Sequence, residues 1–85
     1  MKIKRTQQFV KDYGRPPQDI QRQVNKKLAL FFDNPRHPSR RTKKMRGLEN
    51  IWEVRITKNC RLTFQMEKDI CVLRRIGSHD ILKTP

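Results

Sequence analysis

The stretch from residue 52 to residue 77, WEVRITKNCRLTFQMEKDICVLRRIG, decides the fold. Its first two runs alternate apolar and polar side chains, and every second side chain of a β-strand shares one face. The apolar positions of these runs are Trp52, Val54, Ile56, Leu62, Phe64 and Met66. The third run, ICVLRRIG, is apolar on both faces near its start, as expected of a more central strand. With polar turns at Lys58-Asn59 and Lys68-Asp69, the stretch predicts a three-stranded antiparallel meander.

Two helices are predicted ahead of this meander. Thr6 can cap a short first helix, which Gly14 ends. A second helix starts near Pro17 and stops at Asn34-Pro35, because the residue before a proline is pushed away from helical angles. The apolar residues of the two helices are Phe9, Val10 and Tyr13 in the first, and Ile20, Val24, Leu28, Phe31 and Phe32 in the second. The spacing in the second helix is typical of one amphipathic face.

The order of the expected elements predicts an α+β fold in a single domain over residues 1–85. Residues 1–5 alternate weakly and predict a short first strand, with Ile3 facing inward. Strand, helix, helix and meander then follow, and the two helices cover one face of an antiparallel sheet. The other face is expected to be polar and cationic. It would carry Glu53, Arg55, Arg61, Thr63 and either Arg74 or Arg75, depending on the strand register.

The charge of the chain points to a polyanionic partner. Its 21 Lys and Arg against 8 Asp and Glu give a formal net charge of +13. Such an excess attracts polyanions by releasing their condensed counterions, so nucleic acid is the first expected partner and an acidic protein the second. An anionic membrane is a distant third. No apolar run approaches the roughly 20 residues of a membrane span, and no apolar signal core is visible at the N-terminus, so a cytoplasmic location is expected.

Much of this charge falls in the segment from Pro35 to Gly47, PRHPSRRTKKMRG, which we interpret as a basic connector. Six of its thirteen residues are Lys or Arg and none is acidic. A run of charge is often only a solvated loop, but this one predicts a docking surface for a polyanion such as RNA. The docking residues are Arg36, Arg40, Arg41, Lys43, Lys44 and Arg46. His37 is interpreted as a bystander.

Cys60 and Cys71 are the only cysteines, and neither belongs to a CxxC or a Cys/His metal spacing. Both fall in strand-like runs. We therefore interpret them as reduced packing residues, with a redox or metal role as the minor alternative. No metal and no small-molecule cofactor is expected.

Several fragments, in this order, resemble the RelE/ParE superfamily of toxins. They are Asn34-Pro35, KKMRGL at 43–48, WEVRI at 52–56, RLTF at 61–64 and LRRIGSHD at 73–80. In that family a K-L-x-G element precedes a strand of W/Y-x-x-R-I type and then a Y-R-L-x-F/Y strand. The L-x-x-I/L-G-x-H closure is typical of its YafQ-like branch. The resemblance covers nearly the whole chain and agrees with the order of elements predicted above.

The resemblance implies a RelE-like fold and the toxin of a two-component module, neutralised by a cognate antitoxin that wraps around it. In the RelE-like and YafQ-like branches the toxin cuts mRNA on the ribosome without a metal, whereas the ParE branch inhibits DNA gyrase. An acidic antitoxin, the ribosome and mRNA are therefore the implied partners. The chain departs from the family pattern at three places. Cys60 replaces a tyrosine, Glu53 or Arg55 stands where YafQ-like enzymes carry a histidine, and Lys83-Thr84-Pro85 replaces an aromatic residue.

Metal-free cleavage of RNA needs a base for the 2′-hydroxyl, an acid for the leaving 5′-oxygen and cations around the phosphate. His79 is the candidate for proton transfer, because histidine exchanges protons near neutral pH and this one follows a strand end. Arg61 and Arg55 could clamp the scissile phosphate, and Arg75 could add a further contact. Glu53 is a candidate base, although pairing with an arginine would weaken it.

Each of these residues also has a purely structural interpretation. His79 can be an exposed loop histidine, and the arginines can belong to a solvated sheet face with Glu53 as their cross-strand partner. At the level of function, a ribosome-dependent mRNA endonuclease is favoured by the arginines together with His79. A ParE-like gyrase inhibitor and a non-catalytic RNA-binding relative stay open, because the catalytic set is incomplete by YafQ-like standards.

Overall fold

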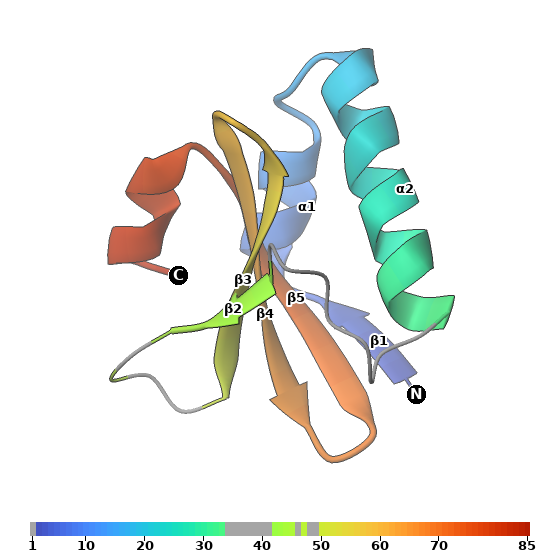
Figure 1. Cartoon of the computed structure of the whole chain (residues 1–85), viewed down its shortest axis with the longest axis vertical. Coiled ribbons are helices and arrows are strands. Elements are labelled where there is room, and N and C mark those ends of the chain that lie inside the picture. Colours follow the sequence, from blue (N-terminus) through green and yellow to red (C-terminus); the bar gives the residue numbers. More distant parts are fainter. Residues whose placement is uncertain (1, 34–41, 46, 48–49) are drawn as a thin grey trace.

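The computed structural model describes residues 2–33, 42–45, 47 and 50–85, with the side chains of residues 42 and 43 left out. The elements, in chain order, are β1 (Lys2–Arg5), α1 (Gln7–Tyr13), α2 (Gln18–Asp33), β2 (Thr42–Lys44), β3 (Ile51–Thr57), β4 (Cys60–Glu67), β5 (Ile70–Gly77) and the 3₁₀-helix η1 (His79–Lys83). The strands form one sheet in the order β1-β5-β4-β3-β2. The two α-helices lie on one side of this sheet and η1 lies on the other (Figure 1). The predicted α+β order is thereby confirmed.

Local chemistry explains why the elements begin and end where they do. The Thr6 hydroxyl accepts a hydrogen bond from the Phe9 N–H at 3.0 Å, which satisfies a donor that the first turn of α1 leaves free. Helix α2 runs from Gln18 to Asp33, just inside Pro17 and Asn34-Pro35. The meander turns fall at residues 58–59 and 68–69, as predicted.

The sheet differs from the prediction in three respects. It is mixed and not antiparallel, because β1 pairs parallel to β5; the long crossover through both helices allows this. Residues Thr42–Lys44, expected within a loop, form β2 against β3. Ile3 lies opposite the buried core residue Cys71 and so shares the helix-covered face, as predicted, but it is 40% exposed. Strand β1 is the edge of the sheet, where cover by the helices is incomplete.

The core lies between the helices and one face of the sheet. Its buried members are Phe9, Val24, Val54, Ile56, Cys60, Leu62, Phe64, Cys71, Leu73 and Ile76. Phe31 of α2 brings its ring centroid to 4.9 Å from that of Phe64. Trp52 stacks on Phe64 at 6.4 Å, which agrees with its interpretation as a packing residue. Burial raises the pKa of Cys71 to about 11 and also raises that of Cys60, so both free thiols stay protonated at neutral pH.

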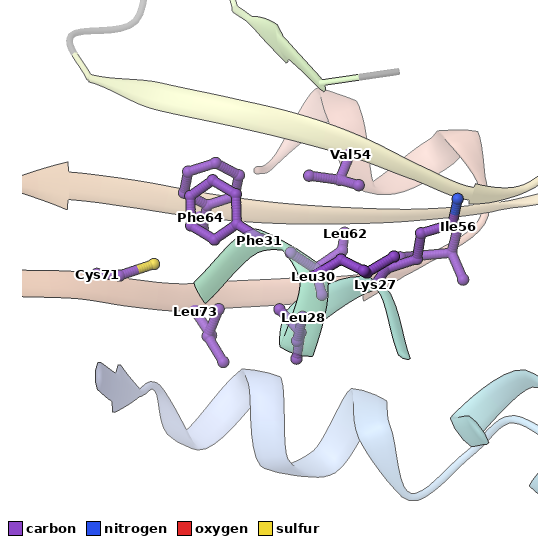
Figure 2. Close-up of a pocket in the computed structure, with 10 residues that line it drawn as sticks. All are labelled: Lys27, Leu28, Leu30, Phe31, Val54, Ile56, Leu62, Phe64, Cys71 and Leu73. Carbon is purple, nitrogen blue, oxygen red and sulfur yellow. The ribbon is translucent and has the colours of Figure 1, made fainter. Parts of the chain in front are cut away.

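A small apolar cavity remains between α2 and the sheet. Figure 2 shows Leu28 and Phe31 facing Leu62, Phe64 and other sheet residues across it. Its volume of about 90 Å³ is well below the roughly 300 Å³ of a small-molecule pocket. The cavity is therefore a packing feature of the core, and its lining is apolar apart from Lys27 and Cys71.

Candidate functional site

The face of the sheet opposite the helices carries the predicted site residues. We call it the polar face. It comprises Glu53, Arg55, Arg61, Thr63, Gln65, Arg74 and Arg75. The register arranges these side chains in rows across three strands. Arg61 lies opposite Arg55 on one side and opposite Gly77 on the other. One row further along, Thr63 lies opposite Glu53 and Arg75.

The register also settles the position of the two consecutive arginines of β5. Thr63 pairs with Arg75 and the next residue, Phe64, pairs with Leu73, so Arg74 is the extra residue of a β-bulge. The bulge allows Arg74 to reach the polar face as well, where its Nη1 donates to Gln65 Oε1 at 2.9 Å. Both arginines therefore serve this face, where the alternation alone allowed only one.

Arg61 is half-buried and anchored at the β3–β4 turn. Its Nη1 donates to the main-chain oxygens of Thr57 at 2.9 Å and Lys58 at 3.1 Å. Within the described ranges, neither its Nε nor its Nη2 makes a hydrogen bond, and Arg55 opposite it makes none either. Like charges directly opposite each other destabilise a sheet. No Glu53–arginine ion pair forms in the part of the chain that the structure describes, so this pair of cations has no carboxylate to offset it there.

His79 comes to the same end of the sheet. It is the first residue of η1 and follows the end of β5 directly after Ser78, whose hydroxyl accepts a hydrogen bond from the Asp80 N–H at 3.3 Å. Because Gly77 pairs with Arg61, the backbone brings His79 to within two residues of the Arg61 row. The imidazole is exposed, and it makes no hydrogen bond to any residue whose position is described.

Two polar atoms of the second row are buried without a hydrogen-bond partner among the described residues. They are Oε2 of Glu53 and Oγ1 of Thr63, and Thr63 is fully buried. A buried hydroxyl or carboxylate oxygen without a hydrogen bond costs free energy. The half-buried Glu53 is therefore less open to an incoming 2′-hydroxyl than its place on a predicted polar strand face suggested.

Asp12 is a neighbour of the candidate site that sequence reasoning missed. It is 2% exposed, and its Oδ2 accepts hydrogen bonds from Arg75 Nε at 3.0 Å and from the Ile76 N–H at 3.1 Å. Burial raises the pKa of Asp12, but the hydrogen bonds from Arg75, Gln8 and Ile76, with the charge of Arg75, outweigh it and leave the pKa below its usual value. The available signal was a polar residue three positions after Phe9, on the buried side of α1.

Asp12 acts together with Thr6 at an open sheet edge. Strand β1 covers β5 only up to Leu73. Beyond that point the Thr6 hydroxyl donates to the Arg74 oxygen at 2.9 Å, and Asp12 accepts from Ile76. The start and end of α1 thus replace a neighbouring strand, and Arg75 is held beside the polar face by an ion pair.

The last residues of the chain fold back onto the same arginines. Arg75 Nη1 donates to the Thr84 hydroxyl at 3.0 Å and to the Thr84 main-chain oxygen at 3.4 Å. Arg74 donates from Nε and Nη2 to the Pro85 main-chain oxygen at 3.3 and 3.2 Å. Arg75, predicted to contact phosphate, is thus bound to Asp12 and Thr84 in this structure.

The predicted docking residues of the connector are placed only in part. Lys44 is exposed on β2, and Lys43 lies opposite Glu53 in the register. The remaining docking residues and the bystander histidine lie outside the described residues: Arg36, Arg40, Arg41, Arg46 and His37. Among the residues that are described, no cluster of three or more His, Cys, Asp or Glu could hold a metal ion, and no helix is long and apolar enough to cross a membrane.

Comparison with known proteins bears on the fold. No family model matches the chain, and no curated protein matches it either. Among solved structures, it superposes on the RelB-RelE antitoxin-toxin complex from Methanococcus jannaschii with a TM-score of 0.79, at 18% identity over 95% of both chains. The chain has the RelE/ParE toxin fold. A YoeB/ParE toxin from Agrobacterium tumefaciens gives a TM-score of 0.80, at 18% identity over 93% of this chain and 99% of that one.

The RelE/ParE fold also includes the E. coli DinJ-YafQ toxin-antitoxin complex, which matches with a TM-score of 0.80 at 14% identity, over 94% of this chain and 93% of that one. The fold expected from the resemblance is thereby confirmed. At identities this low, the comparison is one of backbone arrangement, and the roles of individual residues rest on the geometry described above.

Proposed function

We propose that this chain is the toxin of a two-component toxin–antitoxin module, and that it arrests translation by cutting mRNA on the ribosome without a metal. The observation that carries the proposal is the pairing of Arg55 with Arg61 on the polar face, in the row that contains Gly77, the last residue of the strand that leads to His79. The RelE/ParE fold supports it, since the solved structures with this fold include toxins bound to antitoxins.

The proposed chemistry is an attack of the 2′-oxygen on phosphorus. The bond from phosphorus to the 5′-oxygen breaks, leaving a 2′,3′-cyclic phosphate and a 5′-hydroxyl. Arg61, fixed at the β3–β4 turn, and Arg55 hold the phosphate and stabilise the charge that builds on it. His79 donates a proton to the leaving oxygen, and its lack of a protein partner among the described residues leaves the imidazole available. Glu53 is the candidate base for the 2′-hydroxyl.

The proposed protein partner is an acidic antitoxin. A formal charge of +13 on 85 residues favours a negatively charged segment, and the polar face concentrates four arginines. We expect the segment to cover this face or the groove beside the helices. Its affinity should fall as the salt concentration rises, but buried apolar contacts should keep part of the affinity at high salt. Affinity for the natural antitoxin that did not change with salt would contradict this electrostatic contribution.

The proposed ribosomal contact is the basic connector. Changing Arg40, Arg41, Lys43 and Lys44 together to Ala should weaken binding to ribosomes and flatten its salt dependence, because each cation that contacts a phosphate releases counterions. Thermal unfolding checks that the fold is kept. Unchanged affinity and an unchanged salt slope would place the ribosomal contact elsewhere.

The second candidate function is gyrase inhibition of the ParE type. It is favoured by the engagement of Arg75 with Asp12 and by the buried oxygen of Glu53, which reduce the groups free for catalysis. The deciding experiment induces the chain in cells and follows two readouts together. Primer extension on ribosome-bound message reports cleavage, and the topology of a reporter plasmid reports gyrase activity. We expect new 5′ ends with normal supercoiling; intact message with lost supercoiling would assign the gyrase function instead.

A further inference from the structure

The segment Thr84–Pro85 covers two arginines of the polar face. Pro85 contributes one main-chain oxygen, which accepts from both Nε and Nη2 of Arg74. Thr84 contributes its hydroxyl and its main-chain oxygen, both to Nη1 of Arg75. Three oxygens of one short segment thus accept from Nε and Nη2 of Arg74 and from Nη1 of Arg75, while Arg74 Nη1 donates to Gln65 and Arg75 Nε donates to Asp12.

These contacts fit the arginines only in part. The two donors of Arg74 share a single oxygen at 3.2 and 3.3 Å, longer than the usual N–H···O distance of about 2.9 Å. A guanidinium edge is best matched by an anionic group that offers one oxygen to each N–H, as a carboxylate or a phosphate does. No Asp or Glu side chain of the described residues pairs with Arg74, whereas Arg75 has Asp12.

Beside these arginines lies a buried hydroxyl without a partner. Thr63 sits opposite Arg75 in the register and is fully buried, and its Oγ1 makes no hydrogen bond to a described residue. The 3₁₀-helix η1 packs against β4 and β5 on this side of the sheet (Figure 1). A ligand oxygen admitted next to Arg75 could accept the hydrogen bond that Thr63 lacks.

We propose that Arg74 and Arg75 form a second phosphodiester site on the polar face, which Thr84–Pro85 occupies until an RNA strand displaces it. The site deepens the proposed function, on which it rests for the choice of RNA as the ligand. Its row lies two residues along the strands from the Arg55–Arg61 row, about 7 Å, which is the length scale of one nucleotide in an extended strand. A strand with its scissile phosphate at Arg61 can therefore place a neighbouring phosphate at Arg74 and Arg75.

The segment can leave without unfolding η1. Ile81 is 6% exposed and anchors η1, while Lys83 and Thr84 are exposed. Apart from the arginine contacts, the segment is tied back by a hydrogen bond from the Thr84 N–H to the Ile81 oxygen at 3.1 Å. Displacement exchanges these few hydrogen bonds, whose guanidinium donors are already charged, for hydrogen bonds to a phosphate, which offers an anionic oxygen to each donor.

The test measures binding of a short single-stranded RNA with 2′-O-methyl groups, which cannot be cut through its 2′-oxygen. Removing Thr84 and Pro85 should raise the affinity by about threefold to tenfold, because the competing oxygens are gone. Arg74→Gln should lower the affinity by about tenfold and reduce the log–log salt slope by about 0.7, the value for one phosphate contact on a single strand. In the Arg74→Gln background, removing Thr84 and Pro85 should raise the affinity less than in the parent, because only the contacts of Thr84 with Arg75 are then released.

Matched variants control for charge and fold. Arg22→Gln removes the same charge from an exposed position on α2 and should change the affinity less than about twofold. Thr84→Asp adds a carboxylate beside Arg75 and should weaken RNA binding, whereas Thr84→Asn should not. Arg74→Lys keeps the charge without the two parallel donors, so it should keep the salt slope and lose part of the affinity. Thermal unfolding of each variant verifies that it is folded.

Two results would overturn the site. One is an affinity that does not rise when Thr84 and Pro85 are removed. The other is a rise in affinity upon this removal that is as large in the Arg74→Gln variant as in the parent. A DNA strand of the same sequence should lose as much affinity on Arg74→Gln as the RNA does; a loss confined to RNA would contradict recognition through phosphate. The probe is not cut and no ribosome is present, so this binding test does not depend on cleavage. A chain that binds the probe as expected but leaves mRNA intact would contradict only the proposed cleavage.

Discussion

The two faces of the β3–β4–β5 meander are built from alternate residues of the same strands, yet they differ in what they provide. Leu62 and Thr63 are neighbours and both are fully buried. Leu62 faces the helices and belongs to the apolar core, whereas Thr63 faces the other way with an unpartnered hydroxyl. The helix-covered face therefore contributes most to the free energy of unfolding. The polar face concentrates charge, which lowers this free energy.

The two faces also differ in electrostatics, as Arg55 and Arg61 show, which lie opposite each other on neighbouring strands. On the helix-covered face, cross-strand neighbours such as Trp52 and Phe64 stack on each other. On the polar face, the corresponding neighbours are two cations. Stability alone does not favour such a pair, since like charges directly opposite each other are destabilising. Binding of an anion does favour it.

The largest expected effect is on the polar face and concerns activity. His79→Gln and Arg61→Ala should each slow mRNA cleavage by about 10² to 10⁴, since one removes a positioned acid and the other a charge stabiliser. Primer extension on ribosome-bound message measures the rate, and antitoxin binding should be kept. Arg22→Ala on α2 is the matched loss of charge and should stay active. Full toxicity of both site variants would remove the catalytic assignment.

The next effect is on the helix-covered face and concerns stability. Leu62→Ala should lower the free energy of unfolding by about 2–5 kcal/mol, because it leaves a cavity in the core. In a domain of this size the melting temperature should fall by roughly 10 °C or more. Val10→Ala, at a position 58% exposed, should cost less than about 0.5 kcal/mol. A Leu62→Ala protein that unfolds like the parent would show that this face is not the stabilising one.

Asp12 joins the two faces, and Asp12→Asn should cost about 1–3 kcal/mol at pH 7 because Arg75 loses its carboxylate. The folded pKa of Asp12 is lowered, so the ionised form stabilises the protein above the unfolded pKa of about 3.9. This stabilisation is lost as the pH falls below about 4, toward the lower folded pKa.

Urea unfolding between pH 7 and acid pH tests this linkage. The difference between the parent and Asp12→Asn should shrink as the pH falls, while the exposed Asp33→Asn should follow the parent throughout. A difference that stays constant with pH would mean that the carboxylate charge is not what holds Arg75.

The smallest expected effect is at Thr63. Thr63→Val keeps the shape and removes a buried hydroxyl without a partner, so it should stabilise the protein by up to about 1 kcal/mol. Thr57→Val is the matched control, because the Thr57 hydroxyl accepts a hydrogen bond from the Asn59 N–H at 3.3 Å and its loss should be slightly destabilising. The urea midpoint distinguishes the two signs. Destabilisation by Thr63→Val would indicate that this hydroxyl has a partner.

The alternation of apolar and polar residues predicted the meander and the membership of Arg55 and Arg61 in one polar face, and caps, prolines and helical spacing of apolar residues predicted both helices. Periodicity assigns faces, but it does not assign strand partners. The parallel pairing of β1 with β5 and the three-residue β2 were therefore beyond it. One extra residue in a bulge brings both Arg74 and Arg75 to the polar face, which a strict period of two cannot predict.

The contacts that complete the candidate site are long-range. Asp12 and Arg75 are 63 residues apart, and nothing in the local sequence of either one indicates the other. A carboxylate on the buried side of a short helix was a visible anomaly, but its partner depends on where β1 ends against β5. The contacts of Thr84 and Pro85 likewise depend on the bend that η1 makes after His79.

The parallel pairing of β1 and β5 has a consequence for when the protein can fold during its synthesis. Lys2 lies opposite Ile70 and Arg5 opposite Leu73, so β1 pairs with residues that are synthesised 68 positions later. Contacts this distant in the chain form late and slowly. A nascent chain that has not yet reached residue 70 has neither the partner of β1 nor Arg74, Arg75 and His79. The proposed site therefore cannot form before β5 and His79 have been synthesised.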